Sequence, residues 1–338
     1  MQKSNSNNLL ISIIIPVRND PQNLQKCLQA VADSEYSNYE CIVVDDGSSD
    51  NTPAVARQFP VKLLKLPRNF GPAYARNEGA KIAIGDILYF FDADVVIYPD
   101  TLTKIAEVFT KQPEIDAAIG SYDDEPANSS FISQYKNLFH HYVHQQAGEN
   151  SCIFWSGCGA VRRKVFLKFG GFDIRYGRPA IEDIELGFRL TANRCKIALC
   201  KEIQIKHLKR WTFWGLLKTD IFDRAVPWTV VMLRDRFFPK SLNLQASQRV
   251  SVILVYLLLF LVGVLIFYSR LPAFVLIFPF LILLTLLIFL NHKFYEFFLK
   301  KRGFLFALKV FPFHILYYFY SGLGLMIGVF AYLLKCKI

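Results

Sequence analysis

The chain has 338 residues, of which 53% are apolar, and it carries a formal net charge of +11. This length accommodates more than one domain, and the apolar fraction is high for a purely soluble enzyme. Because the apolar excess lies in the last quarter of the chain and many basic residues stand beside aromatic ones, the composition favours a membrane protein and argues against a nucleic-acid-binding one.

Residues 1–205 alternate strand-like and helix-like segments, which is the pattern of an α/β domain. The predicted strands are 10–17, 39–45 and 62–66, the predicted helices are 21–33, 52–58 and 74–83, and a further apolar strand ends at Asp92. In open α/β sheets the carboxyl ends of the strands border the ligand crevice. We therefore expect the functional residues at these strand ends.

Residues suited to holding a nucleotide follow the first two predicted strands. Pro16 and Arg18 end the first strand, and Asp45 and Asp46 end the second, before a glycine that allows a sharp turn. A carboxylate at this edge can accept a hydrogen bond from the imide N–H of uracil or from a ribose hydroxyl. The alternative is a polar turn that caps the next helix, and both interpretations can hold together.

Two arginines and a pair of carboxylates complete the predicted donor site. Arg68 and Arg76 lie near the same sheet edge, where guanidinium groups can pair with a diphosphate. Asp92 and Asp94 directly follow the apolar run 87–91, and two such oxygen donors suit Mg²⁺ or Mn²⁺ bound together with substrate phosphates. An isolated pair of this kind is more often a solvated turn, but the neighbouring motifs favour the metal site.

The acceptor side is predicted in the segment after residue 150. Trp155 offers an aromatic platform, and Gly157 lets a sugar approach the backbone. Glu182 and Asp183 open a predicted helix, on which the two carboxylates point in different directions. We expect this pair to face the acceptor.

Five motifs occur in order: PVRN at 16–19, VVDDGSSD at 43–50, GPAYARN at 71–77, GD at 85–86 and DAD at 92–94. With these motifs the chain resembles a family 2 glycosyltransferase of the GT-A fold over about residues 9–210. The resemblance implies a nucleotide-sugar donor, with a UDP-sugar favoured. It also implies that Asp45 lies near the base, Asp92 near the sugar or ribose, and Asp94 on the divalent ion.

The Glu182-Asp183 pair matches the base motif of that family, in which the second acid deprotonates the acceptor hydroxyl. A hydroxyl needs such a base because its pKa is far above neutrality, whereas a polyprenyl phosphate arrives ionised. In the family that the chain resembles, the transferases that act on dolichyl phosphate lack this Glu-Asp pair. Its presence here therefore favours a hydroxyl acceptor. We therefore expect inverting transfer to a hydroxyl of a membrane-associated lipid or lipid-linked glycan. The alternatives are a polyprenyl-phosphate glycosyltransferase and a catalytically silent nucleotide-sugar-binding scaffold.

The segment from His207 to Trp211 resembles another motif of the family only in part. Processive synthases carry Gln-x-x-Arg-Trp, and this chain keeps the Arg-Trp but has histidine in place of glutamine. This difference argues against processive synthesis. Arg210 is predicted to contact the diphosphate and Trp211 the acceptor, with anchoring at the membrane interface as a comparable alternative.

Residues 206–249 interleave basic and aromatic residues and predict two amphipathic juxtamembrane helices, with Pro227 ending the first and starting the second. Residues 250–338 contain three apolar runs, at about 250–268, 271–290 and 310–334. A helix of about 20 apolar residues crosses the hydrocarbon core of a bilayer. The sequence therefore predicts three transmembrane helices after the catalytic domain.

The basic residues beside the predicted spans indicate how they are oriented. The segment between the second and third runs contains Lys293, Lys300, Lys301, Arg302 and Lys309, whereas the turn between the first two contains only Arg270. Because cytosolic loops are enriched in Lys and Arg, the N-terminal domain is expected in the cytosol, and the membrane is the plasma membrane if the source is bacterial. Lys335 and Lys337 would then lie outside, which weakens this assignment.

Overall fold

The computed structural model describes residues 9–176, 181–236, 246–267 and 272–334. The chain divides into two units, Met1–Phe213 and Trp214–Ile338. The boundary lies beyond the one expected at residue 205, because β9 (Ile197–His207) continues past that point. The segment after β9 also belongs to the first unit, since the backbone N–H of Leu208 donates to the carbonyl of Asp94 and that of Trp211 donates to Ser133 Oγ.

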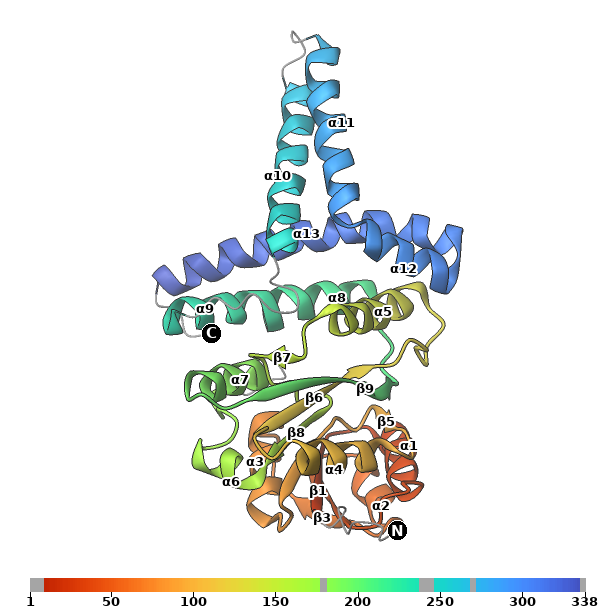
Figure 1. Cartoon of the computed structure of the whole chain (residues 1–338), viewed down its shortest axis with the longest axis vertical. Helices are drawn as coiled ribbons and strands as arrows, with labels where there is room; N and C mark the ends of the chain where they lie inside the picture. The colour runs from red at the N-terminus through yellow and green to blue at the C-terminus, as the bar shows by residue number, and fades with distance from the viewer. Residues whose placement is uncertain (1–8, 177–180, 237–245, 268–271, 335–338) are drawn as a thin grey trace. The chain divides into compact units, whose positions relative to one another are not determined.

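The first half of the N-terminal unit is a parallel βα arrangement that follows the predicted order (Figure 1). Its strands are β1 (Ile11–Val17), β2 (Tyr39–Asp45), β3 (Lys62–Lys65) and β4 (Ile87–Phe90), and its helices are α1 (Pro21–Ala32), α2 (Thr52–Ala56) and α3 (Pro72–Ile82). β1 pairs with β2 and β4, and β2 pairs with β3, all in parallel. β1 is buried at every position, as expected for a central strand covered on both faces.

The second half of this unit adds antiparallel pairs to the same sheet. It contains β5 (Val95–Ile97), α4 (Thr101–Lys111), β6 (Ala117–Tyr122), α5 (Phe131–Gln146), β7 (Asn150–Ser151), β8 (Gly159–Arg162), α6 (Arg163–Lys168), α7 (Glu182–Ala192) and β9. The strand order is β3-β2-β1-β4-β8-β6-β9-β5, with β7 also pairing β9. β8 runs antiparallel to both β4 and β6, so the sheet is mixed.

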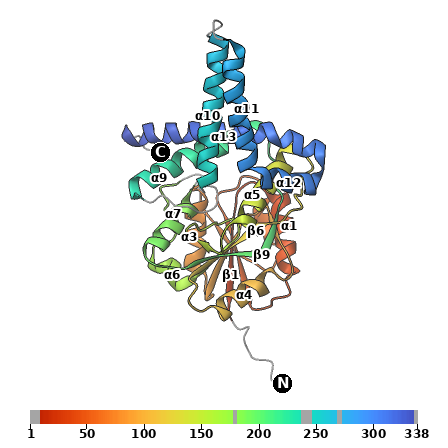
Figure 2. The ribbon, with the colours of Figure 1, turned by 45° about the horizontal axis from the view of Figure 1, so that its top comes forward.

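Helices cover both faces of this sheet, which Figure 2 shows from a second direction. On one face, alternate β1 residues, including Ile13 and Ile15, pack with the apolar sides of α1 and α4. On the other face α3 lies so close that a Cβ at Gly79 would come within 2.6 Å of Ile14. This two-sided burial fixes the strand ends, where the functional residues lie.

The C-terminal unit is entirely helical over its described residues. It contains α8 (Phe213–Lys218), the π-helix η1 (Thr219–Ala225), α9 (Val226–Asp235), α10 (Ala246–Phe267), α11 (Ala273–Leu290), α12 (His292–Arg302) and α13 (Phe304–Leu333). Pro227 lies in the first turn of α9, and the helical segment before it continues through η1 without a break. Residues 237–245 of the predicted juxtamembrane region lie outside the described residues.

By length and composition, α10 and α13 could each cross a membrane, and α11 with α12 would be a third span if this pair, bent by 63°, is counted as one. These helices cover the three predicted runs, but α13 begins at Phe304, before the expected start at 310. The predicted turn at 269–272 lies almost wholly outside the described residues.

Candidate active site

The carboxyl ends of β1 and β2 lie side by side, with Val17 in register with Asp45. Asp45 is fully buried, and its Oδ1 accepts a hydrogen bond of 3.0 Å from the backbone N–H of Ser48. Its Oδ2 is also buried and has no hydrogen-bond partner among the described residues. A buried carboxylate oxygen left without a donor is costly, so this atom is available to a ligand N–H or O–H.

Asp46, the next residue, holds a neighbouring loop. Its two carboxylate oxygens accept hydrogen bonds from the backbone N–H groups of Phe70 (2.8 Å) and Gly71 (2.9 Å). Gly47 has φ +71, and a Cβ there would come within 2.5 Å of the Arg68 backbone. The Asp46 carboxylate therefore positions the loop that carries Arg68, whose exposed guanidinium lies 4.8 Å from the Phe70 ring centre.

The turn after β1 is attached to the loop after β2. Pro16 is buried within β1 in register with Val44, whereas Arg18 is exposed in the turn. Asn19 has φ +51, and its side-chain oxygen accepts a hydrogen bond of 2.8 Å from the backbone N–H of Ser49. Pro16 is thus part of the sheet. Arg18, the other donor residue predicted here, has a side chain that reaches solvent.

Arg76 lies between the donor and acceptor sides. Its side chain is 3% exposed, and its two terminal nitrogens pair with Asp92 Oδ1 at 2.6 Å and with Glu182 Oε1 at 2.8 Å. These two carboxylates occupy the terminal nitrogens of the guanidinium, which we had predicted to pair with a diphosphate. The observed contacts favour a positioning role, because Arg76 joins the end of β4 to the start of α7.

Asp94 faces a histidine that the sequence places far away. β5 pairs antiparallel with β9, with Val95 in register with His207. This pairing brings His207 Nε2 to 3.4 Å from Asp94 Oδ2, while His207 Nδ1 lies 3.0 Å from the Oδ1 of buried Asn137. The Asn137 amide therefore holds Nδ1 of the ring, while Nε2 faces the carboxylate.

This arrangement can hold either a proton or a cation. At 3.4 Å, an N–H on His207 Nε2 can point at Asp94 Oδ2, or a metal ion can bind both atoms. Burial raises the pKa of Asp94, but the neighbouring His207 and Lys209 outweigh burial and lower that pKa overall. No preassembled cluster of three or more His, Cys, Asp or Glu side chains occurs in the part of the chain that the structure describes.

Asp183 lies at the start of α7 and is held by the loop after β7. Its Oδ2 accepts hydrogen bonds of 3.0 Å from both the backbone N–H and the hydroxyl of Ser156, and its Oδ1 accepts one of 2.8 Å from the backbone N–H of Ile184. Burial raises the pKa of Asp183, and the hydrogen bonds and nearby Arg76 offset only part of that rise. Asp183 is therefore a fixed carboxylate with increased basicity.

The predicted acceptor residues form two separate groups. The Trp155 ring packs edge-on against Tyr122, with centroids 4.8 Å apart, and a Cβ at Gly157 would lie 2.7 Å from the Trp155 ring. The glycine therefore accommodates the Trp155 side chain directly. Arg210 is exposed, and the Trp211 ring carries the Lys209 ammonium 4.4 Å from its centre.

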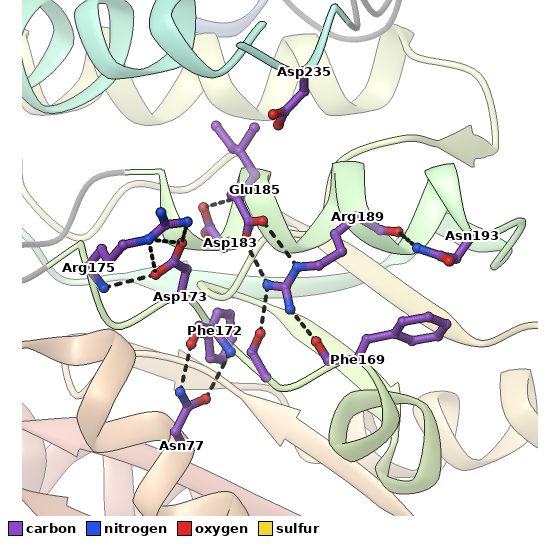
Figure 3. A network of polar contacts seen from close by, with 12 residues as sticks. Asn77, Phe169, Phe172, Asp173, Arg175, Asp183, Glu185, Arg189, Asn193 and Asp235 are labelled. Atoms are coloured by element: carbon purple, nitrogen blue, oxygen red, sulfur yellow. Dashed lines mark hydrogen bonds and ion pairs between the residues drawn. The ribbon is translucent and has the colours of Figure 1, made fainter. Parts of the chain in front are cut away.

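A second network beside α7 fixes the loop between α6 and α7 (Figure 3). Asn77 exchanges two hydrogen bonds with the backbone of Phe172, of 2.7 and 2.9 Å. Arg189, paired with Glu185 at 2.6 Å, donates to the carbonyls of Phe169 and Gly171. A cavity of about 710 Å³ opens here, but none of Asp45, Asp92, Asp94 and Asp183 lines it. We assign this region a structural role.

Three comparisons with known proteins bear on the family and the fold of this chain. Residues 12–170 match the model of the family described as "Glycosyl transferase family 2". Residues 12–170 form a family 2 glycosyltransferase domain. The fold is that of mannosyltransferase PcManGT from Pyrobaculum calidifontis, solved in complex with GDP-Man and Mn²⁺: the TM-score is 0.59 at 16% identity, covering 96% of this chain and 87% of the other.

Two curated relatives show how much of the chain such similarity covers. Glycosyltransferase AglE of Haloferax volcanii is 44% identical over 91 residues, which are 25% of this chain and 30% of that protein. Poly-beta-1,6-N-acetyl-D-glucosamine synthase of Staphylococcus epidermidis is 29% identical over 275 residues, 74% of this chain and 63% of that protein. The chain therefore spans less than two thirds of the length of either relative.

Three residues of the glycosyltransferase unit's candidate site were not predicted as site residues: His207, Asn137 and Ser156. His207 was read only as a departure from the processive motif, and the only sequence signal for it was a histidine at the end of a strand-like segment. Asn137 lies within helix α5, and Ser156 stands between Trp155 and Gly157, which were predicted to contact the acceptor. The pairing of β5 with β9 and the contact of Ser156 with α7 are tertiary features, so local sequence patterns do not reveal them.

Proposed function

We propose that the protein is a membrane-bound, metal-dependent, inverting glycosyltransferase. It transfers a sugar from a nucleoside diphosphate to a hydroxyl group of a membrane-associated lipid or lipid-linked glycan. The observation that carries the proposal is Asp183, a carboxylate of raised pKa fixed by Ser156 beside the Arg76 bridge to Asp92. A base with these properties is needed for a hydroxyl acceptor and not for an ionised phosphate.

The donor half of the proposal is supported by Asp45. Its unpartnered Oδ2 is suited to an N–H of the donor base, which uracil and guanine both present. The synthase relative is named for an N-acetylglucosamine polymer, and the PcManGT structure contains GDP-Man. The bound GDP-Man suggests a nucleotide-sugar donor for this chain, and we propose UDP-sugars, which the sequence motifs favour, as the first class to test.

The donor set at Asp94 fits a Mg²⁺ or Mn²⁺ ion. Asp94 and His207 supply an oxygen and a nitrogen, Asp92 is 45% exposed next to them, and the donor diphosphate would supply further oxygens. A divalent ion held by these residues would supply positive charge against the leaving diphosphate. Asn137 orients His207, and the exposed Arg18, Arg68 and Arg210 can add positive charge at the same substrate.

The acceptor half requires Asp183 to take the hydroxyl proton as the oxygen attacks the anomeric carbon. Attack from the side opposite the leaving diphosphate inverts the configuration at that carbon. Glu182, paired with Arg76, fixes the first turn of α7 and so the direction in which Asp183 points. The long apolar helices of the second unit would hold the enzyme where a lipid-linked acceptor is present.

The test measures transfer of radiolabelled sugar from UDP-sugars and GDP-sugars into native membrane lipids with Mg²⁺ or Mn²⁺, followed by mild acid. Acid-stable label would support glycosylation of a hydroxyl. Acid-labile label would indicate a sugar on a polyprenyl phosphate and would overturn the role of Asp183 as base. Neither transfer nor hydrolysis of any nucleotide sugar would favour a binding scaffold.

A further inference from the structure

Helices α10 and α11 of the C-terminal unit form a hairpin with an apolar, exposed outer part. They pack against each other, and exposed apolar residues continue along α10 from Leu259 to Phe267, which is 83% exposed. α10 has 22 residues and α11 has 18. At 1.5 Å per residue these are about 33 and 27 Å long, close to the ~30 Å hydrocarbon thickness of a bilayer.

Helix α13 contacts this hairpin at one end only (Figure 1). The Tyr318 hydroxyl lies 2.7 Å from Asn291 Oδ1 and 2.9 Å from Gln248 Oε1, within hydrogen-bond distance of both, and Tyr256 donates to the carbonyl of Phe319 at 2.9 Å. The residues that meet α13 thus lie in the first half of α10 and at the end of α11. A third span running beside α10 would make contacts along its length, whereas α13 crosses the base of the hairpin in both views of the ribbon.

The C-terminal half of α13 packs along η1 and α9 through glycines. A Cβ at Gly324 would come within 2.5 Å of Ala225, and one at Gly328 within 2.6 Å of Thr229. Close contact of this kind is typical of small residues at helix interfaces. In the same contact Tyr320 donates a hydrogen bond of 2.7 Å to the buried carboxylate of Asp220.

The helices that pack against α13 carry charges that exclude them from the bilayer core. η1 and α9 contain Asp220, Asp223, Arg224, Arg234 and Asp235, and α12, which packs on the other half of α13, contains Lys293, Glu296, Lys300, Lys301 and Arg302. Placing these charges at the bilayer centre would cost several kcal/mol for each residue. Helix α13 contacts α12 from Phe306 to His314 and contacts η1 and α9 from Tyr320 to Gly328, so both of its halves lie at the depth of these charged helices.

We propose that α13 lies in the plane of the membrane interface and that only α10 and α11 cross the bilayer. The C-terminal unit then crosses the membrane twice, and the start of α8 and the end of α13 lie on the same side. Exposed apolar residues of α13, including Leu305, Met326 and Leu333, face the lipid. Tyr317, Tyr318, Tyr320 and Tyr332 suit the interfacial depth at which tyrosine is enriched.

This arrangement removes the conflict in the charge distribution of the three-span prediction. With two spans, Lys335 and Lys337 lie on the same side as Lys293, Lys300, Lys301, Arg302 and Lys309, and Arg270 alone lies opposite. The asymmetry then agrees with the enrichment of Lys and Arg on the cytosolic side. The inference does not depend on glycosyl transfer, since it rests on helix packing and charge alone.

The first experiment determines on which side each segment lies in a bacterial host. A dual alkaline phosphatase and green fluorescent protein reporter is fused to residue 338 of the full chain, and Arg270→Cys is labelled in intact cells with a membrane-impermeant maleimide. We expect a fluorescent, phosphatase-inactive fusion and external labelling of the Arg270→Cys variant above the background of the unmodified chain. A phosphatase-active fusion would show three spans, and absence of external labelling would show that the hairpin does not cross; either result overturns the proposal.

The second experiment measures depth in reconstituted bilayers. Spin labels are attached to cysteines that replace Leu305, Phe319 and Leu333 on α13, in a background where the partly exposed Cys152 and Cys195, and also Cys336, are serine. We expect equal, shallow depths at the three positions. The matched series Ile253, Phe260 and Phe267 on α10 should be deepest at Phe260. A maximum of depth at Phe319 would instead identify α13 as a span.

Discussion

The donor and acceptor sides of the site each contain one aspartate that the fold partly withdraws from water, and their pKa values shift in opposite directions. Asp94 lies beside His207 and Lys209, which together outweigh burial and lower its pKa. Asp183 is held by Ser156 and lies near Arg76, but burial outweighs these groups and raises its pKa. The direction of each shift is therefore decided by whether the neighbouring groups outweigh burial, as they do at Asp94 and not at Asp183.

This difference supports the different roles that we propose for the two carboxylates. A carboxylate of low pKa stays ionised and suits a cation, whereas one of raised pKa suits proton transfer near neutral pH. Arg76 connects the two sides, because it pairs with Asp92 next to Asp94 and with Glu182 next to Asp183. The geometry of one side is thereby coupled to that of the other.

Asp183→Asn is the largest expected disruption of the acceptor side. The amide has a similar shape but cannot take a proton, so sugar transfer should fall by about 10² to 10⁴-fold while donor binding is kept. Transfer rates and equilibrium binding of a UDP-sugar would be measured in parallel. The control is Asp100→Asn, an exposed aspartate paired with Lys104. Full transfer activity in Asp183→Asn would reject the residue as the base.

Asp94→Asn tests the donor side by removing the charge that faces the cation. Loss of about 4 kcal/mol of transition-state stabilisation corresponds to a decrease of about 10³-fold in metal-dependent transfer. The measurement is the initial rate across a Mn²⁺ titration, with Mn²⁺ binding followed by electron paramagnetic resonance. Asp116→Asn, which disturbs only a contact with the Lys196 backbone, is the control. Normal rate and Mn²⁺ affinity in Asp94→Asn would exclude the metal role.

Asn137→Ala should have a smaller effect, confined to the donor side. Without the side-chain amide, His207 loses the partner that fixes its orientation, and Mn²⁺ affinity should fall by about 10 to 100-fold. Asn137→Asp keeps a polar side chain of the same shape beside His207 Nδ1 and should retain more affinity than the alanine variant. Equal Mn²⁺ affinities in the wild type and Asn137→Ala would show that His207 needs no such support.

The sequence predicted the parts of the site that follow from local patterns. The apolar run before Asp92 and the run before Asp45 each form a buried strand of the sheet, so their carboxylates lie at its carboxyl edge. His207 was not predicted as a site residue, because it reaches Asp94 only through the pairing of β9 with β5. The structure also gives Asp46 a loop-holding role, since its oxygens bind backbone N–H groups that the sequence does not place beside it.

The same limit applies to the second unit. Apolar runs predict helices because hydropathy is a local property, and α10 and α11 agree with those runs. The surface that α13 packs against depends on Gly324, Gly328 and Tyr320 meeting η1 and α9. A hydropathy pattern indicates that a helix is apolar but does not distinguish a helix that crosses the bilayer from one that lies along it.

The smallest expected effect is a displacement of the pH profile. Asp183 must be ionised to accept a proton, and its raised pKa means that activity is lost on acidification at a higher pH than for an ordinary aspartate. Asp94, with its lowered pKa, stays ionised over this range and does not set the acid limb. Ser156→Ala removes the hydroxyl hydrogen bond that stabilises the Asp183 carboxylate, so it should raise the pKa further and move the acid limb of kcat/KM upward by about one pH unit. The contrary outcome is an acid limb that stays at the wild-type pH in Ser156→Ala while Asp183→Asn is inactive. Asp183 would then still be the base, but the Ser156 hydroxyl would not set its pKa.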